Sequence, residues 1–121
     1  MGILSTIIAN ALALFVVSRV LEGMHFTGGV LTYVLVALIV SILNLILKPV
    51  LKLLTFPLIF LTGGLFVILI NAFILFLAQH FITVMDISGV SLVVDNPLTY
   101  LFAAVIFGVA NWMIHWFLKD D

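Results

Sequence analysis

Four apolar stretches dominate the sequence and limit what the chain can fold into. They run over residues 3–21, 30–47, 65–82 and 98–118. Each comes close to the roughly 20 apolar residues that a helix needs to cross a hydrocarbon core about 30 Å thick. Inside a bilayer, backbone amides and carbonyls must find partners within the protein, so each stretch is predicted to be a transmembrane helix.

The composition agrees with a protein whose surroundings are the lipid bilayer. Of 121 residues, 66% are hydrophobic and 7% are charged, which leaves too little polar surface to cover a water-soluble globule. The net charge of −1 argues against a nucleic-acid partner, because such proteins need clustered Lys and Arg. Cysteine is absent, which excludes disulfides and thiolate metal sites. The predicted class is an all-α integral membrane protein with four transmembrane helices.

The basic residues predict the orientation of the spans. With the amino terminus in the cytoplasm, Lys48, Lys52 and Lys119 fall inside and Arg19 is the one basic residue outside. Cytoplasmic loops carry an excess of Lys and Arg, so this topology is favoured. Both termini are therefore expected to be cytoplasmic.

An internal repeat divides the chain into two similar halves. The triplet Leu-Thr-Tyr opens the second stretch, ending at Tyr33, and opens the fourth, ending at Tyr100. In the first and third stretches, an Asn-Ala pair recurs at Asn10 and Asn71. Tandem two-helix units have the same orientation, so a pseudo-twofold axis along the membrane normal is expected to relate the two hairpins. Within a single domain, 1–121, the boundaries are repeat 1 at about 3–48, a linker at about 48–64 and repeat 2 at about 65–119.

Four asparagines are expected to form a polar layer inside the membrane. In the repeat register they are Asn10, Asn44, Asn71 and Asn111, which fall at similar depth in the cytoplasmic half. An unpartnered amide in hydrocarbon costs several kcal/mol, so these side chains are predicted to face other helices. The layer has two interpretations, of which structural hydrogen bonding between helices is favoured over a polar constriction or substrate pathway.

Small residues lead to two of these asparagines along the same helix faces. Spacings of three and four residues place them together, which favours close helix packing. They are Ala37, Ser41, Ala104 and Gly108.

The linker between the second and third stretches is apolar but marked by lysines, prolines and glycines. Its marker residues are Lys48, Pro49, Lys52, Pro57, Gly63 and Gly64. The polar side chains fall on one narrow face, and the prolines are expected to interrupt helical hydrogen bonding. Placement along the inner interface is favoured, and a re-entrant hairpin is the alternative for residues 49–61.

No residue pattern predicts catalysis, a metal site or a cofactor. The three histidines lie in different segments and lack the i, i+4 spacing of a helical metal site. No nucleophile–base pair and no pair of carboxylates can be proposed. The chain is therefore not expected to be an enzyme.

The central stretch resembles a known family. The residues that carry the resemblance are Asn44, Lys48-Pro49, the Leu-Thr-x-Pro run from Leu54 to Pro57, Thr62, Gly64, Phe66 and Asn71-Ala72. They are similar to the small four-span bacterial membrane proteins of the phage holin family, superfamily IV, which include YvlD-type proteins. The resemblance implies a four-helix fold in the bacterial inner membrane and leaves the activity open. The chain departs from the family at Gly63, where a large apolar residue is expected, and this is predicted to loosen the turn.

Two classes of function follow. The favoured one is a structural or interaction protein of the envelope, which associates with a second copy or with another membrane protein through its helix faces. The alternative is a holin-like pore or a small-solute channel or carrier around the asparagine layer. Self-association is expected in either case.

Overall fold

Four long helices account for most of the computed structural model, which describes residues 2–119. They are α1 (Ile3–Val20), α2 (Val30–Leu54), α4 (Phe66–Met85) and α5 (Pro97–Lys119). The shorter elements are β1 (Met24–Thr27), α3 (Phe56–Leu61) and β2 (Ser91–Val94). The four long helices are each long and apolar enough to cross a membrane. The prediction of four long apolar helices is therefore confirmed.

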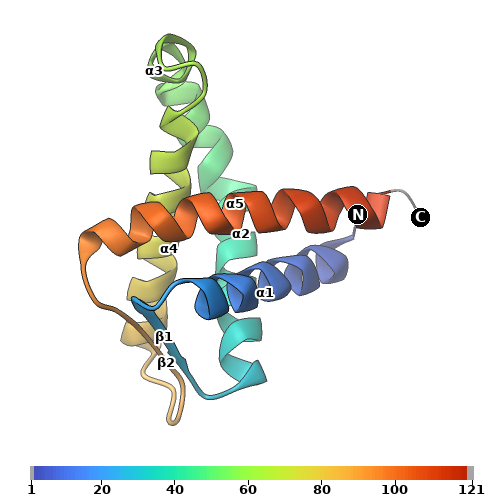
Figure 1. The fold of residues 1–121 in the computed structure, drawn as a ribbon, viewed down its shortest axis with the longest axis vertical. Coiled ribbons are helices and arrows are strands. Elements are labelled where there is room, and N and C mark those ends of the chain that lie inside the picture. Colours follow the sequence, from blue (N-terminus) through green and yellow to red (C-terminus); the bar gives the residue numbers. More distant parts are fainter. Residues whose placement is uncertain (1, 120–121) are drawn as a thin grey trace.

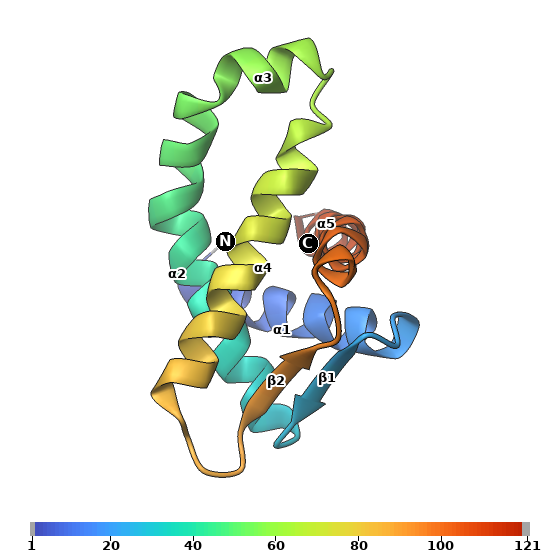
Figure 2. The ribbon, with the colours of Figure 1, turned by 90° about the vertical axis from the view of Figure 1, so that its left-hand side faces the viewer.

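The long helices form two pairs that lie across one another. Figure 1 shows α1 and α5 side by side, running across the upright pair of α2 and α4. Figure 2 shows α2 and α4 joined at one end by α3, with α5 seen nearly end-on. Contacts link α1 to α2 and α5, and link α4 to the same two helices. The four helices therefore meet where the pairs cross and diverge on either side of it.

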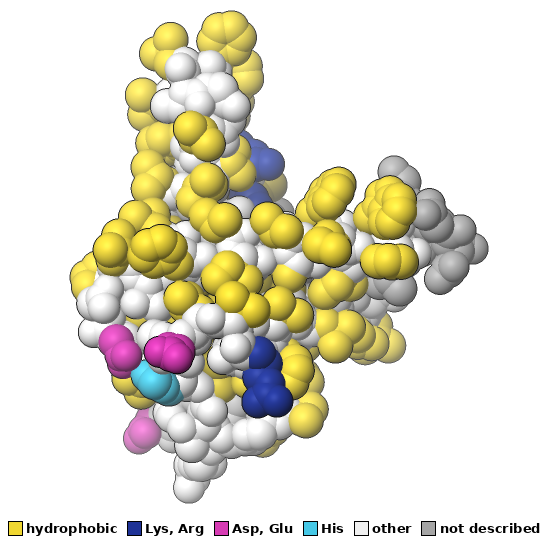
Figure 3. Space-filling view, viewed as in Figure 1, with side chains coloured by type: hydrophobic (Ala, Val, Ile, Leu, Met, Phe, Trp, Pro, Cys, Tyr) yellow, Lys and Arg dark blue, Asp and Glu magenta, His cyan; other side chains and the backbone are white. Residues whose placement is uncertain are grey.

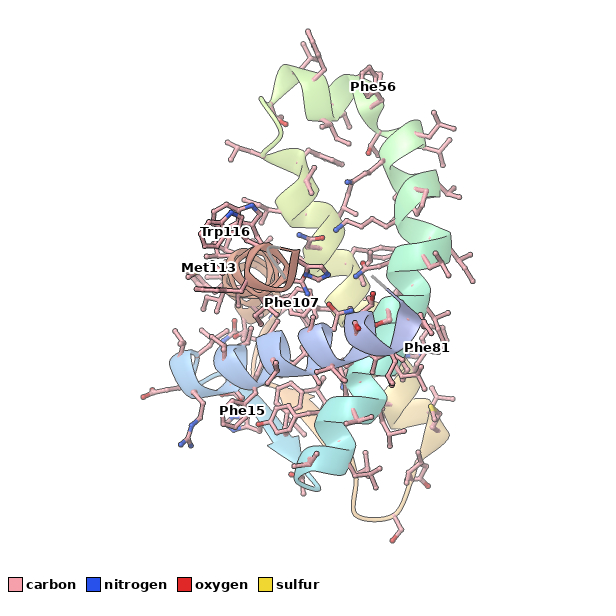
Figure 4. All side chains as sticks on the ribbon, turned by 90° about the vertical axis from the view of Figure 1, so that its right-hand side faces the viewer. Phe15, Phe56, Phe81, Phe107, Met113 and Trp116 are labelled. Atoms are coloured by element: carbon pink, nitrogen blue, oxygen red, sulfur yellow. The ribbon has the colours of Figure 1, made fainter. Side chains whose placement is uncertain are left out.

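Small side chains let the pairs approach closely at the crossing. The buried alanines there are Ala9 and Ala13 of α1, Ala37 of α2, Ala78 of α4, and Ala103 and Ala104 of α5. Without a hydrophobic force between helices in lipid, such close packing supplies much of the association energy. Figure 4 shows Phe107 of α5 pointing toward the other helices, whereas Met113 and Trp116 point away from them.

A short antiparallel sheet closes one end of the molecule. β1 pairs with β2 so that Met24 faces Val94 and Thr27 faces Ser91. The Asp95 amide extends this pairing by donating to the Gly23 carbonyl at 2.9 Å. The expectation of an all-helical chain is therefore incomplete. Each strand has only 4 residues, too few for an alternating pattern to stand out in the sequence.

The second helix is longer than its sequence predicts. We expected it to end at residue 47, yet α2 continues through Pro49 to Leu54. A proline inside a helix removes one backbone hydrogen bond, and here the helix tolerates that loss. The break comes at Thr55, after which Pro57 lies in the first turn of α3, where a missing amide hydrogen is harmless.

The connection from α3 to α4 turns on two glycines. Gly63 has φ 64° and Gly64 has φ 94°. This left-handed region is strained for residues with a side chain, so glycine fits both positions. The Thr62 hydroxyl then accepts a hydrogen bond from the Phe66 amide at 3.1 Å, at the start of α4. Gly63 therefore supplies a conformation that the turn uses, and the expectation that it loosens the turn stays a prediction.

Apolar side chains cover the outer surfaces of both helix pairs. Figure 3 shows yellow hydrophobic groups along both pairs, while the acidic groups and histidine of this face gather near the strands. The connection at α3 is also apolar outside, with Leu53 and Leu61 each 78% exposed. Exposing this much apolar surface to water is unfavourable, so the surface is suited to a lipid environment. The protein is a multi-pass membrane protein.

Candidate functional site

Asn10 of α1 is at the centre of a buried hydrogen-bond network that joins three helices. Its side chain is 2% exposed, and its Nδ2 donates to Oγ of Ser41 in α2 at 2.8 Å. The Ser41 hydroxyl donates in turn to the Ala37 carbonyl at 2.7 Å. From α5, Nδ2 of Asn111 donates to Oδ1 of Asn10. The network therefore ties α1 to both of its neighbours.

The network satisfies polar groups that would otherwise be costly inside the membrane. Among the described side chains, those of residues 2–117, no buried nitrogen or oxygen lacks a hydrogen-bond partner. His115 adds a contact one turn after Asn111, where its Nδ1 donates to the Asn111 carbonyl at 2.8 Å. From the sequence, His115 is considered only as a metal ligand, and no pattern there indicates its contact with Asn111.

The other two asparagines of the expected layer are placed differently. Asn71 of α4 lies beside Gly108 of α5, where a Cβ on the glycine would be 3.6 Å from Nδ2 of Asn71. Asn44 of α2 is half-buried and lines a cleft. No side-chain hydrogen bond joins either of them to another asparagine in the described part of the chain. Of the four asparagines, direct bonding therefore brings together Asn10 and Asn111.

The small residues expected at helix contacts lie near this network. Ala37, Ser41 and Ala104 are buried, and Gly108 is half-buried. Ser41 both packs and bonds, since it accepts from Asn10 across the α1–α2 contact. Gly108 occupies the corresponding position in the second half and has no side chain to offer Asn71.

A cleft with a volume of about 440 Å³ opens beside the network, between α1 and α2. It is lined by Ile3 and Thr6 of α1 and by Ser41, Asn44 and Leu45 of α2. The Thr6 hydroxyl donates to the Gly2 carbonyl at 3.1 Å, which leaves its oxygen able to accept. The cleft therefore offers amide and hydroxyl groups within otherwise apolar walls.

Two lysines continue the polar line of α2 beyond this cleft. Lys48 is one turn after Asn44 and is half-buried, and Lys52 is one turn further and exposed. Residues four apart lie on one face of a helix, so these three side chains share the face that carries Asn44. Figure 3 shows dark blue groups on the upright pair, in the angle that it makes with α5. We call this cleft, together with Lys48 and Lys52 on the same face of α2, the lysine cleft.

Each half also contains a tyrosine–phenylalanine pair that the sequence had not singled out. Tyr33 meets Phe15 with ring centroids 5.7 Å apart, and Tyr100 meets Phe76 at 5.6 Å, both edge to face. The Tyr33 hydroxyl donates to Oγ of Ser18 at 2.8 Å. The Leu-Thr-Tyr repeat was the available signal for these pairs, but it did not indicate the partners.

The end of the molecule at the strands carries one ion pair. Nε2 of His25 in β1 lies 3.1 Å from Oδ1 of Asp95, and both side chains are 54% exposed. These two residues are far apart in the sequence, and their contact depends on a sheet that the sequence does not predict. The pairing was therefore not expected. Across residues 2–119, no group of three or more His, Cys, Asp or Glu side chains could hold a metal ion.

Comparisons with known proteins decide the family. Residues 1–94 match the family described as mycobacterial 4 TMS phage holin, superfamily IV. The chain belongs to this family. The resemblance expected from the residues around the linker is therefore confirmed.

Two relatives of this holin-family chain cover most of its length. An uncharacterised protein of Streptomyces coelicolor is 37% identical over 118 residues, covering 93% of this chain and 92% of the relative. The uncharacterised membrane protein YvlD of Bacillus subtilis is 33% identical over 109 residues, covering 90% of this chain and 86% of YvlD. No solved structure matches the chain. Both relatives extend the similarity beyond the family match into α5.

Proposed function

We propose that this protein is a non-enzymatic structural or interaction protein of the bacterial envelope, which acts through association of its transmembrane helices. The observation that carries the proposal is the buried Asn10 network. The polar groups of Asn10 are used in bonds to Ser41 and Asn111, so they hold helices together instead of lining a path. Such bonds contribute on average about 0.6 kcal/mol each in membranes, enough to fix the register of packed helices.

The outer face of α5 is the surface proposed for association with a second copy or with another membrane protein. Its aromatic side chains are well exposed, with Trp112 68% and Phe117 64% accessible. Large, flat aromatic groups contribute strongly to packed interfaces at low cost in conformational entropy. Met113 and Trp116 extend this surface on the side turned away from the other helices (Figure 4).

The proposed location is the inner membrane, with both termini in the cytoplasm. Lys48 and Lys52 lie toward the end of α2 that leads to α3, whereas Asp95 and His25 lie at the strands. The excess of lysine on one side supports a cytoplasmic position for that side. The sequence favours the inner interface for residues 48–64. Because residues 48–54 continue the spanning helix α2, the proposed interfacial part begins at Thr55, and the apolar exposure of α3 supports it, since a partly embedded helix keeps its apolar side in lipid.

We further propose that the two hairpins, repeat 1 at about 3–48 and repeat 2 at about 65–119, are related by a pseudo-twofold axis along the membrane normal. The helix contacts support this, because exchanging α1 with α4 and α2 with α5 leaves the pattern of neighbours unchanged. Exchanging β1 with β2 also leaves the strand pairing unchanged. In the repeat register Met24 corresponds to Ser91 and Thr27 to Val94, so the pair Met24–Val94 becomes the pair Ser91–Thr27. The matching Tyr33–Phe15 and Tyr100–Phe76 contacts are further support.

A second candidate function is a holin-like pore or small-solute channel. The observation that favours it is Asn44, whose amide lines the cleft of about 440 Å³ next to the buried network. Several copies arranged in a ring could bring such clefts together around a wet centre. Polar groups along intramembrane pathways are a common feature of channels and carriers.

One experiment separates the two functions. The protein is reconstituted in nanodiscs to count subunits by native mass spectrometry, and in liposomes to measure flux of a small fluorescent solute. The structural function predicts a discrete small oligomer and no flux above that of empty liposomes. A ring that conducts would overturn the structural proposal.

A matched pair of variants sharpens the result. Asn10→Leu removes a bonded asparagine, and Asn44→Leu removes one that lines the cleft. The structural function predicts that Asn10→Leu reduces the yield of folded protein more than Asn44→Leu does. A pore predicts that Asn44→Leu alters flux while the protein remains folded.

A further inference from the structure

We infer that the lysine cleft binds the phosphate headgroup of an anionic phospholipid. The inference does not depend on whether the protein acts as a scaffold or as a pore. It concerns Asn44, Lys48 and Lys52 of α2 together with Ile3 and Thr6 of α1.

The depth of the two lysines matches that of a lipid headgroup. At about 1.5 Å per residue, Lys48 lies about 27 Å and Lys52 about 33 Å along α2 from its first residue, Val30. The hydrocarbon core is about 30 Å thick, so in an upright helix the two lysines would bracket its far boundary. Because α2 crosses α1 and α5, it is tilted in the bilayer, which moves both lysines inward (Figure 1). Their long side chains can extend back toward the headgroups.

The two lysines differ in exposure, since Lys48 is partly covered by protein and Lys52 is exposed. Lys48 is half-buried, and the cleft walls next to it come from two different helices, α1 and α2. The opposite face of α2 is apolar, with Leu53 78% and Val50 50% exposed. Figure 3 shows dark blue groups at the right-hand side of the upright pair, above α5. Basic pockets between transmembrane helices are a recognised setting for anionic lipid headgroups.

The charges of the described residues are separated along the molecule. Among residues 2–117, whose side chains the structure describes, the one salt-bridge contact is that of His25 with Asp95, at the strands. Glu22 and Asp86 flank the strands at the same end of the molecule. A lysine in a low-dielectric environment gains strongly from an anion, and a lipid phosphate is the anion available at this depth.

Polar groups near the lysines can contact other parts of a phospholipid. Asn44 and Thr6, which can bond to ester oxygens, line the cleft among the apolar side chains of Ile3 and Leu45. Lys48 and Lys52 follow one and two turns after Asn44 on α2, next to the cleft lining. The volume of about 440 Å³ is large enough for the glycerol region and the first part of a chain. The cleft therefore fits a lipid that enters from the bilayer with its phosphate at Lys48 and Lys52.

The test measures lipid binding by native mass spectrometry of the detergent-solubilised full chain. Phosphatidylglycerol and phosphatidylcholine of the same chain length are added separately. We expect the wild type to retain phosphatidylglycerol preferentially. We expect Lys48→Gln with Lys52→Gln to weaken this binding about 30-fold, or about 2 kcal/mol, because each basic residue near the membrane surface contributes about 1 kcal/mol.

Two control variants isolate the site from general charge. Arg19→Gln removes a positive charge from the end of α1 near the strands, and its phosphatidylglycerol binding should equal that of the wild type. Lys48→Arg with Lys52→Arg keeps both charges and should retain binding. Circular dichroism and size-exclusion chromatography check that each variant is folded.

Three results would overturn the inference. They are equal retention of the two lipids by the wild type, unchanged phosphatidylglycerol binding in the double glutamine variant, and equally tight binding of water-soluble glycerol phosphate. The first and third comparisons use only the wild type, so they decide the question even if a variant fails to fold.

Discussion

In the first half of the chain, Asn10 of α1 donates to Ser41 of α2, whereas in the second half Asn71 of α4 meets Gly108 of α5, which has no side chain. Ser41 and Gly108 occupy corresponding positions of the repeat. The missing hydroxyl accounts for one of the two bonds of Asn10 that Asn71 lacks. The other is the bond from Asn111 to Asn10, which has no counterpart between Asn44 and Asn71 among the described residues. The polar contacts of the two halves differ although their asparagines correspond.

The aromatic contacts differ much less between the halves. Tyr33 and Tyr100 each meet a phenylalanine edge to face, at 5.7 Å and 5.6 Å. Packing of this kind depends on shape, which both halves preserve, while a hydrogen bond depends on one particular atom. The comparison teaches that the apolar contacts define the duplicated fold, and that polar contacts can be lost from one copy without altering it.

The largest expected effect comes from removing the bonded asparagine. Asn10→Leu is expected to lower the free energy of unfolding by about 1 to 3 kcal/mol, because it removes two interhelical hydrogen bonds and leaves Ser41 and Asn111 with fewer partners. The matched variant Asn71→Leu is expected to cost less than about 0.5 kcal/mol. Unfolding in sodium dodecyl sulfate, followed by circular dichroism, measures both. Equal losses would contradict the proposed difference between the halves.

The general features of this fold were accessible from the sequence, but its particular contacts were not. The lengths of the apolar stretches predicted four spanning helices, and the central residues predicted the family. The crossing of the two helix pairs was not predicted, because the same apolar faces would also pack in a parallel bundle. The continuation of α2 through the exposed Pro49 was not predicted either, because a proline inside an apolar stretch is expected to end a helix.

The candidate site was predictable only as a set of residue types. An amide in hydrocarbon must find a partner, which placed Asn10 and Asn111 in a common layer. Whether Asn44 and Asn71 also bond is determined by small distances between helices, and the sequence does not contain these. The pairing of His25 with Asp95 depends on β1 and β2, which were too short to predict.

Removing the acceptor instead of the asparagine makes the first half resemble the second. Ser41→Ala leaves one Asn10 amide hydrogen without its partner, at a cost of about 1 kcal/mol, partly offset by the better helix propensity of alanine. We expect a net loss of about 0.5 to 1 kcal/mol in the same unfolding measurement. The double variant Ser41→Ala with Asn10→Leu should be no less stable than Asn10→Leu alone, since the shared bond is already gone. Additive losses would show that Ser41 contributes through packing.

The tyrosine pairs offer a comparison in which the halves should differ only slightly. The Tyr33 hydroxyl donates to Ser18 at 2.8 Å, whereas that of Tyr100 donates to Gln79 at 3.4 Å. Tyr33→Phe is expected to cost about 0.5 to 1 kcal/mol, and Tyr100→Phe about half of that, because the longer bond is weaker. Thermal unfolding in detergent, monitored by circular dichroism, compares them. A larger loss for Tyr100→Phe would reverse the expected order.

The smallest effect is a gain, from giving the second half the hydroxyl that it lacks. A Cβ at Gly108 would lie 3.6 Å from Nδ2 of Asn71, an ordinary contact distance, so Gly108→Ser fits and can accept a hydrogen bond as Ser41 does. Gly108→Ala is the matched control, because either replacement removes the entropy cost of glycine in a helix. Alanine has the better helix propensity by about 0.5 kcal/mol, so without a new bond the serine variant would be the less stable of the two. We expect the serine variant to equal or exceed the alanine variant in stability, with the difference lost when Asn71→Leu is added to both. If that second substitution leaves the difference unchanged, the hydroxyl does not bond to Asn71, and the two halves differ by more than the one side chain at this position.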